Sequence, residues 1–411
     1  MSTKKKIQIL LFTSFFSLFF SCSNNSYRKI ENEENVLFTI YLDNLLKNED
    51  ILFFSSLFNG IKTITLETNE NCMIGRINKI RVFNKFIYIL DSQVSKSLLV
   101  FNTEGHFIMK IGTIGIGPGE FVEPSDFTID TEKNIIYILD GYAQQINKYK
   151  ILTGDFINSI KLDRNIRSYH IEFAKGKLFA DAYFSEHSDN HYLLRNILDT
   201  SGKEYCNYLN VIEYNKGLSN TTFIENDVFY IRENGNVLFV QQFMDRMIEI
   251  NNDSIFSLLA IKSKDVFTPK DLKICKIKGI HKSFSEILEL NKIYRIFNFI
   301  ENKNWIIFTY MKGIKSYTVM INKITHKIEL IHKSYNDLFF SGKIFDYPVP
   351  VPQVGCYTSE GVYYYFDSTS SQVVRSMAQE EILSSNLDSL DKLKSLDNNE
   401  NPILFYYDFK D

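Results

Sequence analysis

The sequence predicts an all-β protein, a six-bladed β-propeller with seven blades as the alternative. The word Ile-Tyr-Ile-Leu-Asp occurs at residues 87–91 and returns at residues 136–140, an offset of 49 residues. Four further identities keep that offset: Gly105 with Gly154, Phe107 with Phe156, Ile108 with Ile157, and Ile111 with Ile160. Repeats of about 40–50 residues made of short strands are typical of propeller blades. The 35 Phe and 24 Tyr agree with this class, because aromatic residues favour strands.

The second copy of the repeat divides into four strands. They span residues 126–130, 135–139, 145–151 and 156–162. The turn between the last two is Thr153-Gly154-Asp155, in which glycine supplies the positive φ that tight hairpins use. A meander of this size is one propeller blade.

Fainter copies of the repeat follow along the chain. Strand-like segments occur at residues 176–180, 227–231, 237–240, 247–250, 305–310, 319–324 and 361–367. The chain from Ile61 to Asp411 is roughly 350 residues long, and at about 50–60 residues per blade it predicts six blades. Tighter blades would give seven.

Two segments interrupt the strand pattern and a third closes it. Residues 268–290 are compatible with a helix, and residues 379–396 place apolar side chains at helical spacing, which predicts a short C-terminal helix packed on the ring. Residues 402–407 read as a closing strand. Because a ring must join its two ends, we expect this strand to pair with residues 61–66 and to leave no exposed edge there.

The N-terminus has the pattern of a secretory signal over residues 1–21. Lysines at positions 4–6 precede an apolar stretch from Ile7 to Phe20 that is too short to span a bilayer. Ser21 stands directly before Cys22, an arrangement that resembles the bacterial lipoprotein signal, whose cysteine receives the lipid. The alternative is an ordinary cleaved signal in which Cys22 is incidental.

We therefore divide the chain into a signal peptide over residues 1–21, a lipidated cysteine and polar tether over 22–59, and a propeller domain over 60–411. The lipid would anchor the domain to a membrane. One position departs from the lipoprotein pattern, because Phe19 stands where leucine is usual. The expected location is the cell envelope, as an outer-membrane lipoprotein, with the periplasmic and external faces both open.

Charge and cysteine usage argue against several classes of partner and site. The formal net charge is −3, and mild acidity gives no electrostatic support for nucleic-acid binding, which needs a basic face. The four cysteines after Cys22 lack the paired spacing of a metal cluster. His187 and His191 have the spacing of metal ligands on a helix, but they fall in a polar segment that predicts a loop. We expect no metal and no cofactor.

The most distinctive loop is the glycine-rich stretch at residues 112–121. A phosphate-binding loop of this kind would lead into a helix N-terminus. This loop contains Pro118 and is followed by a strand at residues 127–129. We interpret it as a connection between blades that needs tight turns.

These segments resemble the six-bladed β-propeller lipoproteins of Gram-negative bacteria, relatives of NHL-type repeat proteins. The residues that carry the resemblance are Leu66-Glu67-Thr68, Ile74-Gly75, 87–91, 105–108, 111–121 and Asn401-Pro402-Ile403-Leu404. The resemblance covers about residues 60–411 and is strongest in the first two blades. It implies a propeller fold, an export route and a binding role, and it brings no settled activity and no catalytic motif.

Asp91 and Asp140 end equivalent strands in two blades. Paired carboxylates can act as general acid and base. A residue that recurs from blade to blade is better explained by a structural duty, such as accepting hydrogen bonds from loop N–H groups. We therefore expect both carboxylates to be structural.

We expect a binding site at the mouth of the central channel, built from the loops at residues 112–125 and 344–357. The candidate residues are Glu120, Phe121, Glu123, Asp346, Tyr347 and Tyr357. The favoured function is a membrane-anchored module that binds a small molecule, a glycan or a protein without catalysis. The alternative is a carbohydrate-active hydrolase or lyase, which for glycoside hydrolysis would need carboxylates about 5–10 Å apart at the mouth.

Overall fold

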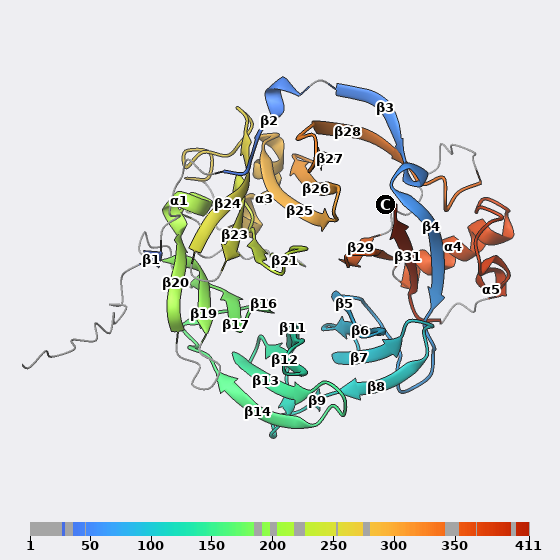
Figure 1. The fold of residues 1–411 in the computed structure, drawn as a ribbon. Coiled ribbons are helices and arrows are strands. Elements are labelled where there is room, and N and C mark those ends of the chain that lie inside the picture. The colour runs from blue at the N-terminus through green and yellow to red at the C-terminus, as the bar shows by residue number, and fades with distance from the viewer. Residues whose placement is uncertain are drawn as a thin grey trace, which may run out of the picture.

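A computed structural model of the protein shows six β-sheets of four or five strands, among the described residues, arranged around a central axis (Figure 1), so the predicted six-bladed propeller is confirmed. The structure describes residues 27–28, 36–45, 47–184, 191–197, 204–217, 227–251, 254–273, 280–341, 353–366, 368–395 and 400–410. The strands of each blade are given below from the innermost to the outermost.

The first two blades are regular four-stranded meanders. Blade 1 contains β5 (Lys79–Phe83), β6 (Phe86–Asp91), β7 (Ser97–Asn102) and β8 (Phe107–Ile111). Blade 2 contains β11 (Pro124–Asp130), β12 (Ile135–Asp140), β13 (Gln145–Lys150) and β14 (Phe156–Lys161). The repeated word occupies the second strand of both blades, as the repeat predicts.

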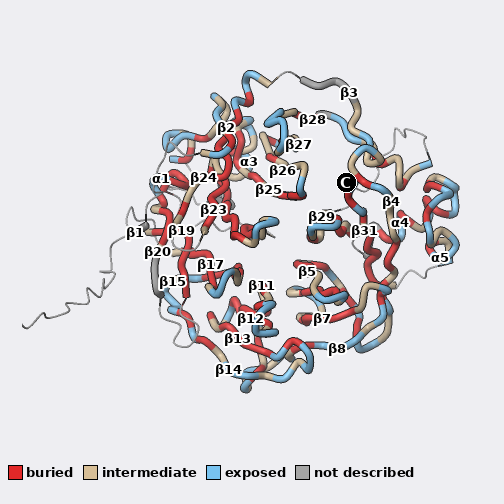
Figure 2. The backbone as a smooth tube through the Cα atoms, in the orientation of Figure 1, coloured by how far each residue is buried: buried red, intermediate tan, exposed pale blue. Residues whose placement is uncertain are grey.

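The repeated word is apolar at its first four positions because both faces of its strand are buried. In β6, Ile87 and Ile89 belong to a core cluster shared with blade 6, whereas Tyr88 and Leu90 belong to the core shared with blade 2. Successive side chains of a strand point to opposite faces, and each blade packs on a neighbour at both faces. The interior strands are accordingly buried in Figure 2, and exposed residues are concentrated in turns and on the outermost strands.

Blades 3, 4 and 5 keep the same order. Blade 3 contains β16 (Ile171–Ala174), β17 (Lys177–Asp181), β19 (Tyr192–Ile197) and β20 (Glu204–Asn210). Blade 4 contains β21 (Phe229–Ile231), β22 (Val237–Phe239), β23 (Arg246–Asn251) and β24 (Ser254–Lys262). Blade 5 contains β25 (Ile293–Glu301), β26 (Trp305–Lys312), β27 (Lys315–Asn322) and β28 (Ile328–Tyr335).

Blade 6 closes the ring by combining the two ends of the chain. It contains β29 (Gln353–Tyr357), β30 (Gly361–Phe366), β31 (Ile403–Phe409) and, outermost, β4 (Phe58–Thr65). β31 and β4 pair antiparallel from Ile403 opposite Thr65 to Phe409 opposite Phe58. The predicted closing strand is therefore confirmed.

The described residues before β4 lie along the outer rim of the ring, as the blue strands in Figure 1 show. β1 (Tyr27–Arg28), β2 (Phe38–Tyr41) and β3 (Lys47–Phe53) each add a parallel strand outside β20, β24 and β28. We expected a polar tether over residues 22–59. In the described part of that range, strands pair with blades 3, 4 and 5 in succession, so the segment is built into the sheets.

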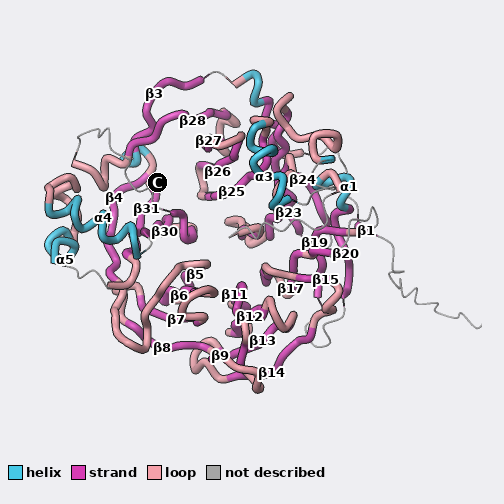
Figure 3. Tube along the Cα trace, turned by 180° about the vertical axis from the view of Figure 1, so that it is seen from behind, coloured by secondary structure: helices cyan, strands magenta, loops and turns pink. Residues whose placement is uncertain are grey.

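Short elements fill the connections. They are the 3-10 turns Leu42–Asn44 and Phe54–Ser56, the strands β9 (Thr113–Ile114), β10 (Glu120–Phe121), β15 (Ile166–Arg167) and β18 (Tyr183–Phe184), and the helices α1 (Val211–Asn215), α3 (Ile280–Glu289), α4 (Ser368–Gln379) and α5 (Leu390–Ser395). α3 falls within the segment predicted to be helix-compatible. α4 and α5 lie at the outer edge of blade 6 (Figure 3). Among the described residues, no helix is long and apolar enough to cross a membrane.

The predicted single helix over residues 379–396 is wrong in its bounds. α4 ends at Gln379, Glu381 takes a φ of 58°, and α5 begins only at Leu390. A positive φ stops a right-handed helix. Leu383, Leu387 and Leu393 are still buried in the core of blade 6. Their spacing reflects contact with the ring and not a continuous helix.

Candidate functional site

A cavity of about 380 Å³ lies in the central channel. The innermost strand of every blade contributes to its wall, and so do the turns that join the first two strands of blades 2, 3 and 4. The lining residues are Arg81, Val82, Phe83, Ile129, Asp130, Thr131, Glu132, Glu172, Phe173, Ala174, Lys175, Gly176, Asp227, Phe229, Tyr230, Ile231, Gly235, Asn298, Phe299, Val354, Gly355, Cys356 and Tyr357. This volume lies within the range of small-molecule sites.

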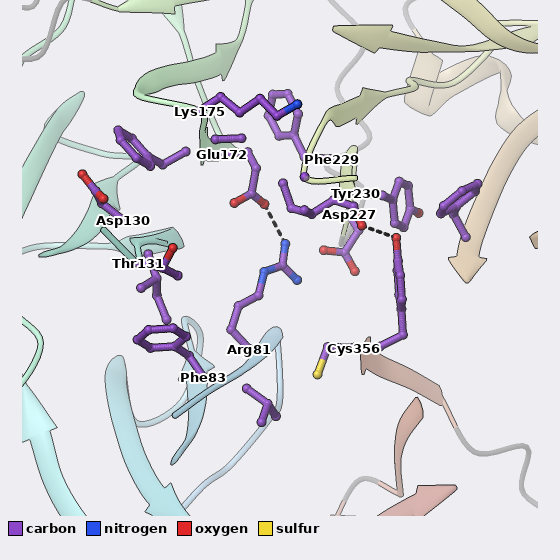
Figure 4. Close-up of a pocket in the computed structure, with 18 of the residues that line it drawn as sticks. Arg81, Phe83, Asp130, Thr131, Glu172, Lys175, Asp227, Phe229, Tyr230 and Cys356 are labelled. Atoms are coloured by element: carbon purple, nitrogen blue, oxygen red, sulfur yellow. Dashed lines mark hydrogen bonds and ion pairs between the residues drawn. The ribbon is translucent and has the colours of Figure 1, made fainter. Parts of the chain in front are cut away.

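Arg81 projects from β5 into the cavity and pairs with Glu172 of β16 (Figure 4). Its Nη2 atom lies 2.7 Å from Glu172 Oε2. Lys79 Nζ lies 3.8 Å from the same oxygen and 2.7 Å from Asp126 Oδ1, and the Thr128 hydroxyl donates to Glu172 Oε1. Burial alone would raise the pKa of Glu172, but Arg81 and Lys79 hold it below its usual value. Glu172 is therefore ionised, and both of its oxygens are engaged.

Asp227 lies beside this network, just before β21, and its carboxyl group faces the side of Arg81 opposite Glu172 in Figure 4. Within the part of the chain that the structure describes, no residue forms a hydrogen bond or an ion pair with this carboxyl. Burial raises the pKa of Asp227, although Arg81 and Lys79 oppose the rise. A half-buried carboxyl without a partner, in the wall of a cavity, is available to a ligand.

Asp130, at the end of β11, presents a second unsatisfied carboxylate oxygen. Its Oδ1 accepts hydrogen bonds from the backbone N–H groups of Glu132 and Lys133, at 3.0 and 2.9 Å. Its Oδ2 is buried and has no hydrogen-bond partner, although the residue is only 1% exposed. Buried polar atoms are seldom left unpaired, and this oxygen has no donor among the described residues.

Tyr357 and Cys356, from β29, complete the wall on the side of blade 6. The Tyr357 hydroxyl donates to the carbonyl oxygen of Ile231 at 2.5 Å, which ties β29 to β21. Burial raises the pKa of Tyr357 well above its usual value and that of Cys356 to about 12. Cys356 is therefore a thiol at neutral pH and does not have the low pKa of a reactive cysteine.

Of the residues proposed from the sequence for the channel mouth, Tyr357 lines the cavity. Asp346 and Tyr347 lie outside the described residues. The other three lie in the connection between blades 1 and 2. Phe121 is fully buried in the core between those blades, and Glu120 Oε2 accepts a hydrogen bond of 2.7 Å from Gly117 N–H. Glu120, Phe121 and Glu123 are not among the residues that line the cavity.

Asp91 and Asp140 hold loops to their blades. Asp91 accepts hydrogen bonds from the backbone N–H groups of Gly75, Arg76, Gln93, Val94 and Ser95, and Asp140 from those of Val122, Glu123, Tyr142 and Ala143. In each case the carboxylate joins the loop that enters the blade to the loop that follows its second strand. Asp181 in blade 3 likewise accepts hydrogen bonds from Tyr169 and His170 N–H.

The remaining candidates from the sequence fall elsewhere. Cys22 and His187 lie outside the described residues. The ring of His191 stacks on Phe184, with centroids 3.9 Å apart. Among the described residues, no group of three or more His, Cys, Asp or Glu side chains has the arrangement of a metal site.

Sequence reasoning missed Arg81, Glu172, Asp130 and Asp227, because they belong to four different blades and no local motif links them. The sequence contained only a weaker indication than a motif, namely charge within strands that are otherwise apolar. Arg81 and Glu172 are charged residues in the otherwise largely apolar innermost strands β5 and β16. A charged residue in such a strand indicates either an internal ion pair or a position in the channel wall. Arg81 and Glu172 form an ion pair with each other and also line the channel.

Comparison with known proteins agrees with this fold. The chain matches a protein of Bacteroides fragilis NCTC 9343 described as a candidate exported protein, with 19% identity and a TM-score of 0.70, over 91% of this chain and 99% of that one. A member of the DUF4221 family from Bacteroides vulgatus ATCC 8482 matches with 9% identity and a TM-score of 0.51, over 86% of this chain and 97% of that one. These likenesses concern the fold.

Among curated proteins, a search found no match to the chain. A family model described as "Domain of unknown function (DUF4934)" matches residues 37–408, which begins just before β2 and ends within β31. That range includes the rim strands β2 and β3 together with all six blades. The chain therefore belongs to the DUF4934 family.

Proposed function

We propose that the protein is an exported binding module that takes a small organic molecule into its central channel. One observation carries the proposal: a cavity of about 380 Å³, walled by all six blades, contains a carboxyl group, that of Asp227, that no described residue pairs. Concave sites with apolar walls and a few polar groups are the usual form of small-molecule sites. The rigid ring would hold these groups in place before a ligand arrives.

The alternative, a carbohydrate-active hydrolase or lyase, has weaker support. The cavity does contain carboxyl groups, and burial and pairing shift the pKa values of Asp227 and Glu172 in opposite directions. Such divergence is expected of a general acid and its partner base. However, the Glu172 oxygens are already engaged by Arg81, Lys79 and Thr128, so this carboxylate is not free to activate water. The geometry favours binding.

Binding in the cavity is tested with a cavity-filling variant. Ala174 lies in the wall, and Ala174→Phe would occupy the space. Ile324, 72% exposed in a turn of blade 5, supplies the matched control Ile324→Phe. Purified protein is screened by ligand-observed NMR against a pool of amines, amino acids, carboxylic acids, monosaccharides and disaccharides. We expect at least one class to bind wild type and Ile324→Phe but not Ala174→Phe.

The proposal is overturned if no component of the pool binds, or if binding survives in Ala174→Phe. The catalytic alternative is tested by a separate assay on the same purified protein. Release of nitrophenol from a panel of aryl glycosides by wild type, lost in Asp227→Asn, would establish hydrolysis in place of simple binding.

We further propose that the chain is exported to the cell envelope and anchored by a lipid on Cys22. The signal-like pattern of residues 1–21 supports this, as does the likeness to a candidate exported protein. Metabolic labelling with a radioactive fatty acid tests it. We expect label in wild type and in Cys72→Ala, and none in Cys22→Ala. Undiminished labelling of Cys22→Ala would exclude Cys22 as the lipid site.

A further inference from the structure

The charged residues in the cavity wall carry a negative balance. Two are cationic and four are acidic, which gives 2 − 4 = −2 when all are ionised: Arg81 and Lys175 against Asp130, Glu132, Glu172 and Asp227. Both cations already have partners. Arg81 pairs with Glu172, and Lys175 Nζ donates to the side-chain oxygen of Asn236.

The acidic residues are not matched in this way. Of the four, only Glu172 forms an ion pair among the described residues, while Asp227 forms no hydrogen bond and Asp130 Oδ2 is buried without a donor. An acceptor without a donor costs free energy, and Asp227, which is only half-buried, can receive a donor from a ligand in the cavity. The cavity wall therefore has more acceptors than donors and more negative than positive charge.

Aromatic rings form much of the remaining wall. They are Phe83, Phe173, Phe229, Tyr230, Phe299 and Tyr357. Aromatic faces attract cations through the ring quadrupole, and they also provide apolar contact for a hydrocarbon body. Both properties favour the same type of ligand.

We propose that the ligand of the cavity is an organic cation, a protonated amine on a small apolar body, whose ammonium group is received by the carboxylate of Asp227. This inference rests on the proposed binding function and adds the chemical class of the ligand. An anionic ligand would meet two cations, Arg81, which Glu172 already pairs at 2.7 Å, and Lys175, which already donates to Asn236. A neutral alcohol could donate a hydrogen bond to Asp227 but would leave the negative balance of the wall unchanged.

Ligand binding and the ionisation of Asp227 are coupled. The groups that act on this carboxyl are Arg81, Lys79 and His170, which favour its ionised form, and Asp126, which disfavours it; burial outweighs them, so the pKa is raised in the empty cavity. An ammonium group would favour the ionised form of Asp227, so the carboxyl would release its proton when the amine binds. Affinity for an amine should therefore increase as the pH rises through the pKa of Asp227 and level off above it.

Four probes with the same phenyl body test the charge preference by isothermal titration calorimetry on the purified protein. They are 2-phenylethylamine (cation), 2-phenylethanol (neutral), 3-phenylpropanoate (anion) and L-phenylalanine (zwitterion). We expect the amine to bind at least about tenfold more tightly than the other three, because charge-assisted hydrogen bonds are about twice as strong as neutral ones. Proton release on amine binding should appear as a dependence of the measured heat on the buffer.

Variants of Asp227 test whether its carboxyl group causes the preference for the amine. Asp227→Asn is a neutral isostere of a carboxyl whose neutral form burial already favours, so the fold should tolerate it. It should reduce amine affinity about tenfold, to that of the alcohol, and abolish the pH dependence. Asp227→Glu should retain preference for the amine, and Glu120→Gln, in the connection between blades 1 and 2, should behave as wild type.

Equal or tighter binding of the alcohol, the anion or the zwitterion would overturn the inference, and so would amine binding that Asp227→Asn leaves unchanged. Absence of amine binding up to millimolar concentration would overturn it as well. Failure of the cationic class can be distinguished from failure of the proposed binding function. If the mixed pool contains a ligand that Ala174→Phe excludes while the amine does not bind, the binding function stands and the cationic class is wrong.

Discussion

The side chain of Asn401 accepts a hydrogen bond of 2.8 Å from the backbone N–H of Ile74, across 327 residues of sequence. Its Nδ2 donates to the carbonyl oxygens of Glu67 and Cys72, at 2.7 and 2.9 Å. Asn401 is 3% exposed and stands just before β31, whose pairing with β4 closes the ring. One side chain thus fixes the entry to blade 1 against the last strand of blade 6.

Replacing Asn401 with alanine should destabilise the protein by about 3 kcal/mol, because it removes three hydrogen bonds and leaves buried backbone groups unpaired. The free energy of unfolding in urea measures the effect. The matched control is Asn165→Ala, at an exposed turn position, which should change stability by less than about 0.5 kcal/mol. Equal effects in the two variants would contradict this role.

Asp91→Asn should destabilise the protein by about 3 kcal/mol at neutral pH, because an amide cannot accept all five backbone hydrogen bonds. The effect should depend on pH. Burial would raise the pKa of Asp91, but the N–H groups of Ser95, Val94 and Gly75 hold it below its usual value. The contribution is therefore fully present above the unfolded pKa of about 3.9 and is lost as the pH falls through the lower folded value.

Urea unfolding of wild type and Asp91→Asn at a series of pH values measures this dependence. The difference in unfolding free energy should be constant near neutral pH and shrink below about pH 4. Asp163→Asn, at an exposed position, is the control and should show little difference at any pH. A gap between wild type and Asp91→Asn that widens on acidification would refute the assignment.

Arg81→Met should destabilise the protein by about 3 kcal/mol, because it leaves Glu172, whose side chain is 3% exposed, without its 2.7 Å partner. Removing both charges should destabilise the protein less than removing that of Arg81 alone. The double variant Arg81→Met/Glu172→Gln is therefore expected to be more stable than Arg81→Met alone. A double-mutant cycle in urea measures the coupling, and strictly additive effects would show that the two residues do not interact.

Ile40→Ala should destabilise the protein by about 3 kcal/mol, because Ile40 is fully buried in the core of blade 4 although it belongs to the N-terminal rim segment. Leu37→Ala, three residues earlier, is the matched control, since Leu37 is 56% exposed and should contribute less than about 0.5 kcal/mol. Thermal and urea unfolding report both changes. A negligible effect of Ile40→Ala would mean that β2 is dispensable for the ring.

The structure corrects the sequence where local pattern and tertiary contact diverge. The leucine spacing of residues 379–396 predicted one helix, yet Glu381 takes a left-handed conformation, and the leucines reach the core from the connection after α4 and from α5. The rim strands β2 and β3 could not be predicted from the sequence either. A short strand whose partner lies more than 200 residues away has no local signature of its pairing.

The sequence alone determined the ring: the word at residues 87–91 and 136–140, apolar because both faces of its strand are buried, defined a blade, and the last strand defined the closure. It also predicted a structural duty for Asp91 and Asp140, since repetition at a fixed offset is visible in the sequence itself. Only the tertiary structure decided the site. Arg81, Glu172 and Asp227 come from three blades and meet at the axis because the ring brings innermost strands together. Which of them pair depends on distances across the channel, and those distances cannot be read from the order of residues in the sequence.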